Sequence, residues 1–181
     1  MSIGNHTDAE LASELNSVSG FSGILKVVSG EYTNPDAVFN AISYVASHAI
    51  GCNGIGCSAI AEEAIYDFHR IKALYGKTDG KQLKHIVVAF NPSTSINEES
   101  IHWIAWYIAA YFHYASYQVF YGIHETQIKK RTAYHIHFVI NTINFATGLR
   151  LNWFVTDKDN FIQYIESLPY GFSISSVNSY Y

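Results

Sequence analysis

The sequence predicts an α+β protein built around a central antiparallel β-sheet, and three observations support this. Residues 135–141 alternate between apolar and polar side chains, which is typical of a strand with two different faces. Residues 117–123 are aromatic and β-branched, so they are expected to form the neighbouring strand. Apolar residues also recur at helical spacing, as at Val38, Ile42 and Val45. Hairpin-linked strands with helices gathered elsewhere indicate the α+β class.

The expected elements follow from apolar periodicity and from helix-start signals. Pro35 suits the first turn of a helix that Asn34 caps, and Ser58 caps the next helix. Asn97 and Thr156 open two later helices, and the glycine-rich segment 51–56 is expected to be a flexible loop. In order, the expected strands cover residues 24–28, 85–90, 117–123, 135–141, 149–155 and 172–177, and the expected helices cover 34–49, 58–75, 97–112 and 156–168.

The composition fits one domain over residues 1–181, in which residues 1–20 form a polar lead with a weak helix near Asp8 to Leu15. Hydrophobic residues make up 49% of the chain and aromatics 15%, which predicts a real core. The net charge of −4 opposes broad, nonspecific binding to nucleic acid, although it permits a local site.

We expect no membrane span and a cytoplasmic location, since no apolar run reaches the length of a span and the N-terminus lacks the features of a secretory signal. In that location Cys52 and Cys57 are expected to be free thiols, and a local disulfide or a pair of metal ligands are the alternatives.

Three histidines are expected to converge on one face of the predicted sheet. His135 and His137 are two residues apart in an alternating strand, so both side chains point to the same side. If the preceding strand pairs with it in antiparallel fashion, His124 at its end lies close to His135. Neutral imidazoles held by a rigid support are suitable ligands for a divalent metal. The alternative is that these histidines bind no metal, because a single histidine in a strand is usually solvated or hydrogen-bonded.

Several segments of the sequence, described next, resemble a known family, the relaxases or mobilisation nucleases of conjugative elements such as plasmids, in the HUH endonuclease superfamily. The segment His135-Ile136-His137-Phe138-Val139-Ile140-Asn141 is similar to the metal segment of that family, and Gly122-Ile123-His124-Glu125 is similar to the segment that supplies the other histidine. Residues 76–92 resemble the stretch that leads into the second motif, and residues 40–45 resemble the first motif, in which a helix carries the nucleophilic tyrosine. The tyrosine segment precedes the histidines, which is the order of the mobilisation type rather than of rolling-circle initiators.

The resemblance implies a ferredoxin-like sheet and a specific reaction. The expected activity is site- and strand-specific nicking and strand transfer of single-stranded DNA at a transfer origin, through a covalent 5′-phosphotyrosine. The implied nucleophile is Tyr44, with Tyr32 as a rival, and the implied ligands of the metal are His124, His135 and His137. The implied cofactor is one divalent ion, Mn²⁺ or Mg²⁺ first, with Zn²⁺, Ni²⁺ or Co²⁺ as alternatives, and accessory mobilisation proteins are implied partners. The alternative function is a non-catalytic or degenerate module of a mobile element that binds DNA or a partner.

Other polar residues near these motifs are candidates for supporting roles. Lys129, Lys130 and Arg131 lie between the two histidine segments, so we expect them to contact the DNA backbone. The remaining candidates for outer-shell or accessory roles are Glu125, Asn141, His85 and His48, each of which has an ordinary structural reading as well.

Overall fold

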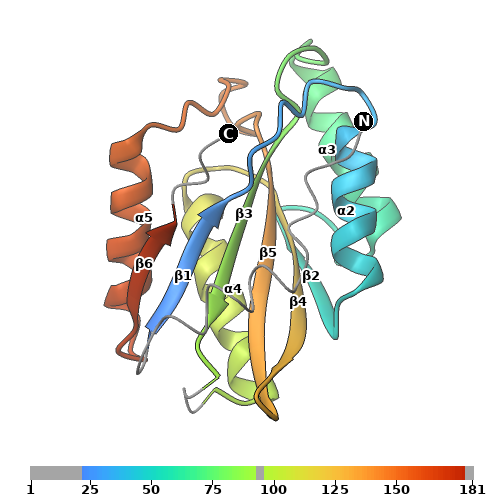
Figure 1. Cartoon of the computed structure of the whole chain (residues 1–181). Helices are drawn as coiled ribbons and strands as arrows, with labels where there is room; N and C mark the ends of the chain where they lie inside the picture. The colour runs from blue at the N-terminus through green and yellow to red at the C-terminus, as the bar shows by residue number, and fades with distance from the viewer. Residues whose placement is uncertain (1–21, 93–95, 178–181) are drawn as a thin grey trace.

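The structure is a computed structural model that describes residues 22–92 and 96–177 of the chain. Its centre is a six-stranded sheet with the strand order β2-β4-β5-β3-β1-β6. The strands are β1 (Ser22–Val27), β2 (Gly51–Ile55), β3 (Leu83–Phe90), β4 (Val119–Ile128), β5 (Arg131–Asn141) and β6 (Ser173–Val177). The helices are α2 (Ala37–Ser47), α3 (Ala61–Leu74), α4 (Glu98–Tyr114) and α5 (Val155–Ser167). Figure 1 shows this arrangement, which confirms the predicted α+β class.

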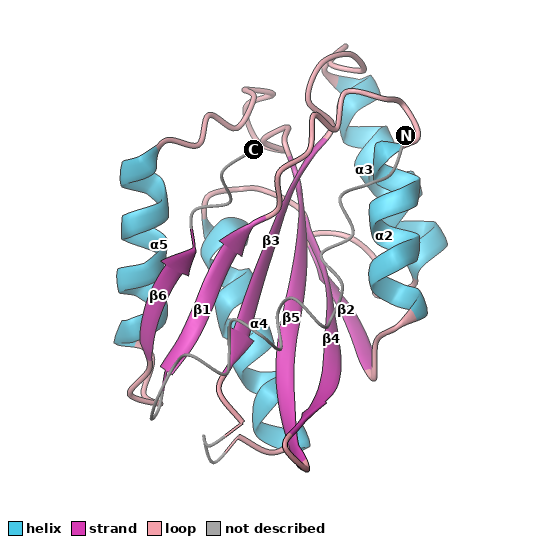
Figure 2. Cartoon of the chain, in the orientation of Figure 1, coloured by secondary structure: helices cyan, strands magenta, loops and turns pink. Residues whose placement is uncertain are grey.

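Four of the five strand pairings are antiparallel, so the predicted antiparallel sheet forms the centre of the molecule. The exception is β6, which runs parallel to β1 and makes the complete sheet mixed. The helices divide between the two faces (Figure 2). Helices α4 and α5 pack on one face, around Ile108, Phe138 and Phe161. Helices α2 and α3 pack on the other face, around Ile42, Phe68 and neighbouring side chains of β3, β4 and β5.

The central hairpin of β4 and β5 is longer than the sequence suggests. The two expected strands stopped at residue 123 and resumed at residue 135, but most of the residues between them continue the strands in register as far as Ile128 and Arg131. The turn itself is only Lys129 and Lys130, which have φ values of 50° and 65°. Two residues with positive φ fit a turn whose twist matches that of the flanking strands. The extra pairing is favoured because it satisfies backbone groups that a loop would leave to water.

The helix α4 confirms its predicted start. The side chain of Asn97 accepts a hydrogen bond from the backbone nitrogen of Ser100 at 2.8 Å, and the Ser100 hydroxyl accepts one from the Asn97 nitrogen at 2.9 Å. This reciprocal pair is a capping box, which satisfies two donors of the first helical turn. Glu98 and Glu99 follow in that turn, where negative charge is favourable.

Five predicted elements differ from the structure. Helices α2 and α3 begin at Ala37 and Ala61, after the caps Asp36 and Ile60, so Asn34 and Ser58 do not cap them as expected. The side chains of Asn34 and Ser58 instead accept hydrogen bonds from the backbone nitrogens of those cap residues, at 2.8 Å and 3.1 Å.

The segment expected to be a loop, residues 51–56, contributes the edge strand β2, because pairing with β4 uses only backbone groups. Residues 149–155 were expected to form a strand but make only one bridge, between Arg150 and Ile143, since β2 and β6 already occupy the two edges of the sheet. Helix α5 begins at Val155, and Thr156 lies inside it instead of capping it. The helix predicted near residues 8–15 lies outside the described residues.

Candidate metal centre

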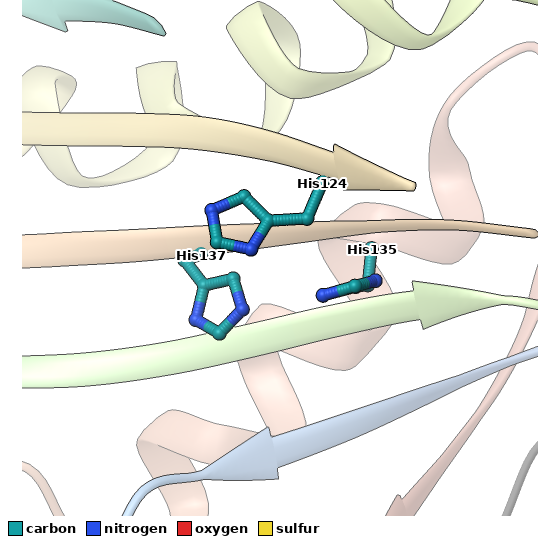
Figure 3. Close-up of side chains that lie close together, drawn as sticks. All are labelled: His124, His135 and His137. Carbon is teal, nitrogen blue, oxygen red and sulfur yellow. The ribbon is translucent and has the colours of Figure 1, made fainter. Parts of the chain in front are cut away.

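The three predicted histidines lie together on the face of the sheet that α2 covers. His124 and His135 are directly opposite each other in the register of β4 and β5, and His137 follows two residues later on the same face. The ring centroids are 5.2 Å apart for His124 and His135, 4.4 Å for His124 and His137, and 5.2 Å for His135 and His137. One nitrogen from each ring lies within 4.8 Å of the others, and Figure 3 shows the rings arranged around a common space. His124 therefore lies within β4, rather than at its end as the sequence suggested.

Hydrogen bonds engage one nitrogen of His124 and one nitrogen of His137. The Nε2 atom of His124 donates to the backbone carbonyl of Val45 at 2.8 Å, which leaves Nδ1 to carry the lone pair. The Nδ1 atom of His137 is 2.9 Å from Nε2 of His85. If Nδ1 of His137 donates in this bond, its Nε2 presents a lone pair to the common space. Outer partners of this kind fix the tautomer and orientation of metal-binding histidines.

The site is buried, and burial disfavours the charged form of His137 and of His85 beside it. The exposed fractions of His124, His135 and His137 are 1%, 1% and 3%. Burial, and after it the neighbouring imidazoles, keep the pKa of His137 well below its ordinary value. Burial, followed by the proximity of His124, lowers the pKa of His85 to about 4. Neutral imidazoles keep the lone pairs that a metal requires.

This donor set fits a divalent transition metal. Nε2 of His137 is buried and has no hydrogen-bond partner within residues 22–92 and 96–177, which is costly unless another group binds it. Three neutral nitrogens suit manganese, zinc, nickel or cobalt better than magnesium, which prefers oxygen ligands. Three protein ligands also leave coordination positions open for a substrate oxygen. The histidine cluster thus supports the expected divalent cofactor and does not select one ion.

The helix α2 brings Tyr44 against this cluster. The ring centroid of Tyr44 is 5.7 Å from that of His137 and 6.1 Å from that of His124. The ring of His48, one turn further along α2, is 5.2 Å from Tyr44 and 6.1 Å from His124. Nδ1 of His48 lies 3.1 Å from the Tyr44 carbonyl oxygen, so this imidazole packs back onto its own helix. Tyr44 lies off the buried stripe of Val38, Ile42 and Val45, and this flank of α2 lies against the histidines.

The rival tyrosine is in a different environment. Tyr32 packs with apolar residues of two hydrophobic clusters, one beneath α2 and one on β1 and β3. Burial raises its pKa to about 12, which opposes formation of the phenolate that would attack a phosphate. Tyr32 is therefore the weaker candidate for a nucleophile.

A family model described as the nuclease domain of MobA/VirD2-like relaxases matches residues 44–169, which is well over half of the chain. The chain belongs to this relaxase family. The match begins at Tyr44 and includes all three histidines of the cluster. Family membership supports nicking of DNA as the general activity of this relaxase. Comparison with curated proteins and with solved structures gives no match. Within the described residues of this relaxase, no helix combines the length and apolar character needed to cross a membrane.

The other predicted residues of this relaxase occupy three separate places. Glu125 follows His124 directly and is exposed, so its side chain leaves β4 on the opposite face from the cluster. The two turn residues at the hairpin tip are five and six positions beyond His124, roughly 17–20 Å along the strand. Asn141 lies at the far end of β5, about 14 Å from His137 by strand rise. These residues are therefore outside ligand distance of the histidine cluster.

Asn141 belongs to a buried polar network that the sequence did not reveal. Its amide nitrogen donates to Gln118 Oε1 at 2.8 Å and to the Phe68 carbonyl at 3.2 Å. Its side-chain oxygen accepts a hydrogen bond from Lys72 Nζ, and Lys72 is only 1% exposed. The signal for Lys72 was its spacing, four residues after Phe68 and eight after Ala64 on the buried side of α3. The network joins α3 to the end of β5.

Proposed function

We propose that this relaxase cleaves and rejoins one strand of DNA at a transfer origin, with Tyr44 as the nucleophile and a divalent metal held by His124, His135 and His137. The observation that carries this proposal is the position of the Tyr44 ring, with its centroid 5.7 Å from that of His137 at the edge of a cluster of buried imidazoles. A phosphate bound at the cluster would lie close to this ring. Such close placement lowers the entropic cost of in-line attack.

In the proposed step, the phenol oxygen of Tyr44 attacks a backbone phosphorus and the bond from that phosphorus to the 3′ oxygen breaks. The phenol loses its proton, and the departing 3′ oxygen gains one and becomes a hydroxyl. The downstream part of the strand then remains linked to Tyr44 through its 5′ phosphate, as a phosphotyrosine. Because one phosphodiester is exchanged for another, the 3′ hydroxyl can reverse the step, which hydrolysis by water would prevent.

The protein groups around Tyr44 have distinct roles in this proposal. A bound divalent metal would polarise a non-bridging phosphate oxygen and offset the charge that develops during transfer. His85 and the Val45 carbonyl orient two of the ligands through the hydrogen bonds described above. His48 lies against the Tyr44 ring, where its imidazole restricts the position of the phenol. The substrate is single-stranded DNA in the cytoplasm, with accessory mobilisation proteins as partners.

A randomised single-stranded DNA library, incubated with the purified protein and Mn²⁺, tests this function. Covalent complexes that survive denaturation are isolated, and sequencing of the attached DNA defines an oligonucleotide for further work. We expect an adduct with the wild type and none with Tyr44→Phe, which keeps the ring and removes only the attacking oxygen. Tyr32→Phe is the matched control and should still form the adduct.

Two results would contradict the proposal. An adduct with Tyr44→Phe would place the nucleophile elsewhere. If the wild type forms no adduct with Mn²⁺, Mg²⁺, Zn²⁺, Ni²⁺ or Co²⁺, the catalytic function is refuted and the alternative of a DNA-binding module replaces it.

A further inference from the structure

A buried hydrogen bond joins α2, the helix that carries Tyr44, to β4, the strand that carries His124. Val45 follows Tyr44 in the last turn of α2, where backbone carbonyls lose their usual helical partners. The nitrogen that would normally bond to the Val45 carbonyl, that of Ala49, bonds to the Ala46 carbonyl at 3.4 Å instead. The Val45 carbonyl accepts from Nε2 of His124 at 2.8 Å. A proposed metal ligand is thus bonded to the residue next to the proposed nucleophile.

This contact requires glycine at position 122 of β4. A Cβ atom there would lie 2.6 Å from Cγ1 of Val45, 3.0 Å from the Val45 carbonyl oxygen and 3.2 Å from Cβ of Ala49. The Val45 side chain is β-branched and fully buried, so it cannot easily rotate away. Glycine inside a strand often marks such a close approach of backbones. Gly122 is also the register partner of His137, which places the contact inside the cluster.

We infer that metal binding and the seating of the tyrosine helix are coupled through the bond from His124 to the Val45 carbonyl, and that Gly122 is the positioning residue that permits it. This inference rests on the proposed metal site. A cation at Nδ1 of His124 withdraws electron density from the ring, so its Nε2–H becomes a stronger donor. The metal then holds the last turn of α2 more firmly. By linkage, a well-seated helix raises the affinity for the metal by the same factor.

The test compares the wild type with Gly122→Ala and with Ile123→Val. Ile123 is the next residue of β4 and is buried on the opposite face, so its substitution perturbs the same strand without touching α2. Calorimetry measures the affinity for Mn²⁺, and hydrogen exchange followed by mass spectrometry measures protection of the α2 amides with and without Mn²⁺. In the wild type, Mn²⁺ should slow exchange in the last turn of α2. In Gly122→Ala, the Mn²⁺ affinity should fall about tenfold or more, the range found when an outer partner of a ligand is lost, and the slowing should disappear. Ile123→Val should behave as the wild type.

A second variant separates this coupling from general damage to the strand. Val45→Ala added to Gly122→Ala removes the closest contact, so it should recover part of the lost Mn²⁺ affinity even though it deletes buried methyl groups. A variant damaged only in its folding would bind Mn²⁺ no better after this second loss. Unchanged affinity and unchanged protection in Gly122→Ala would overturn the inference and leave the proposed function intact. Failure of the wild type to bind Mn²⁺, Zn²⁺ or Co²⁺ would instead refute the proposed metal site itself.

Discussion

Replacing Lys72 with Met should change how the stability of this relaxase depends on pH. Burial, followed by the positive charge of Arg150, lowers the pKa of Lys72 to about 7, whereas an unfolded lysine has a pKa of about 10.4. Between pH 7 and pH 9 the unfolded chain therefore binds more protons at this position than the folded chain does. The free energy of unfolding should rise with pH across this interval. Integrating about 1.4 kcal/mol per pH unit, less the part for which folded Lys72 is still protonated just above pH 7, gives roughly 2 kcal/mol.

Urea unfolding at pH 7, 8 and 9 measures this effect. Met matches the length of the lysine stem and carries no charge, so Lys72→Met should remove about 2 kcal/mol of the pH dependence. Burial also lowers the pKa of Lys84, to about 8, but both proteins contain Lys84 and its effect cancels in the comparison. The interval ends below the ordinary pKa of tyrosine, which excludes the buried phenols. Equal slopes for the two proteins would mean that Lys72 stays charged in the folded state, and the reasoning from burial would be wrong.

Three further outcomes are expected. His85→Ala should weaken Mn²⁺ binding about 10- to 100-fold in calorimetry, because His137 loses its outer partner, and undiminished affinity would argue against that role. The triple variant Lys129→Asn, Lys130→Gly and Arg131→Gln should keep the turn, since Asn-Gly suits its positive φ values. It should reduce the slope of single-stranded DNA affinity against salt concentration by about 0.7 per lost phosphate contact. Fluorescence anisotropy at several salt concentrations measures this slope, and an unchanged slope would mean that the hairpin tip makes no phosphate contact. Gly148→Ala should lower the free energy of unfolding measured in urea by more than about 1 kcal/mol, because the residue has a φ of 71° and an added Cβ would overlap the ring of Tyr75. Wild-type stability would contradict the assigned backbone conformation.

Side-chain periodicity predicted the parts of this fold in which side chains decide the structure. Alternation along β5 placed His135 and His137 on one face, and the capping signal at Asn97 located the start of α4. Where the structure differs from the predicted elements, backbone pairing between strands decided the outcome. β2 forms from the segment 51–56 despite its glycines, because β4 offers it an open edge.

The same distinction explains what was missing from the predicted site. The convergence of three imidazoles followed from residue types and spacing. The Val45 carbonyl could not be predicted, because every residue has a carbonyl and only the end of a helix leaves one for His124. Gly122 gave a partial signal, since glycine within an aromatic and β-branched strand suggests that another backbone comes close. The proximity of Tyr44 to the cluster depended on the packing of α2, which the helical stripe constrains only approximately.

The two-residue turn between β4 and β5 also has a consequence for the order in which the site assembles. The three histidines belong to a single local hairpin, and an isolated hairpin closes in about 1–10 μs. Tyr44 comes from a helix distant in sequence, so its arrival requires the slower closure of a long loop. The proposed ligand set can therefore form before the proposed nucleophile reaches it. A metal ion captured by the nascent hairpin would stabilise that register and act as a template on which the rest of the sheet is built.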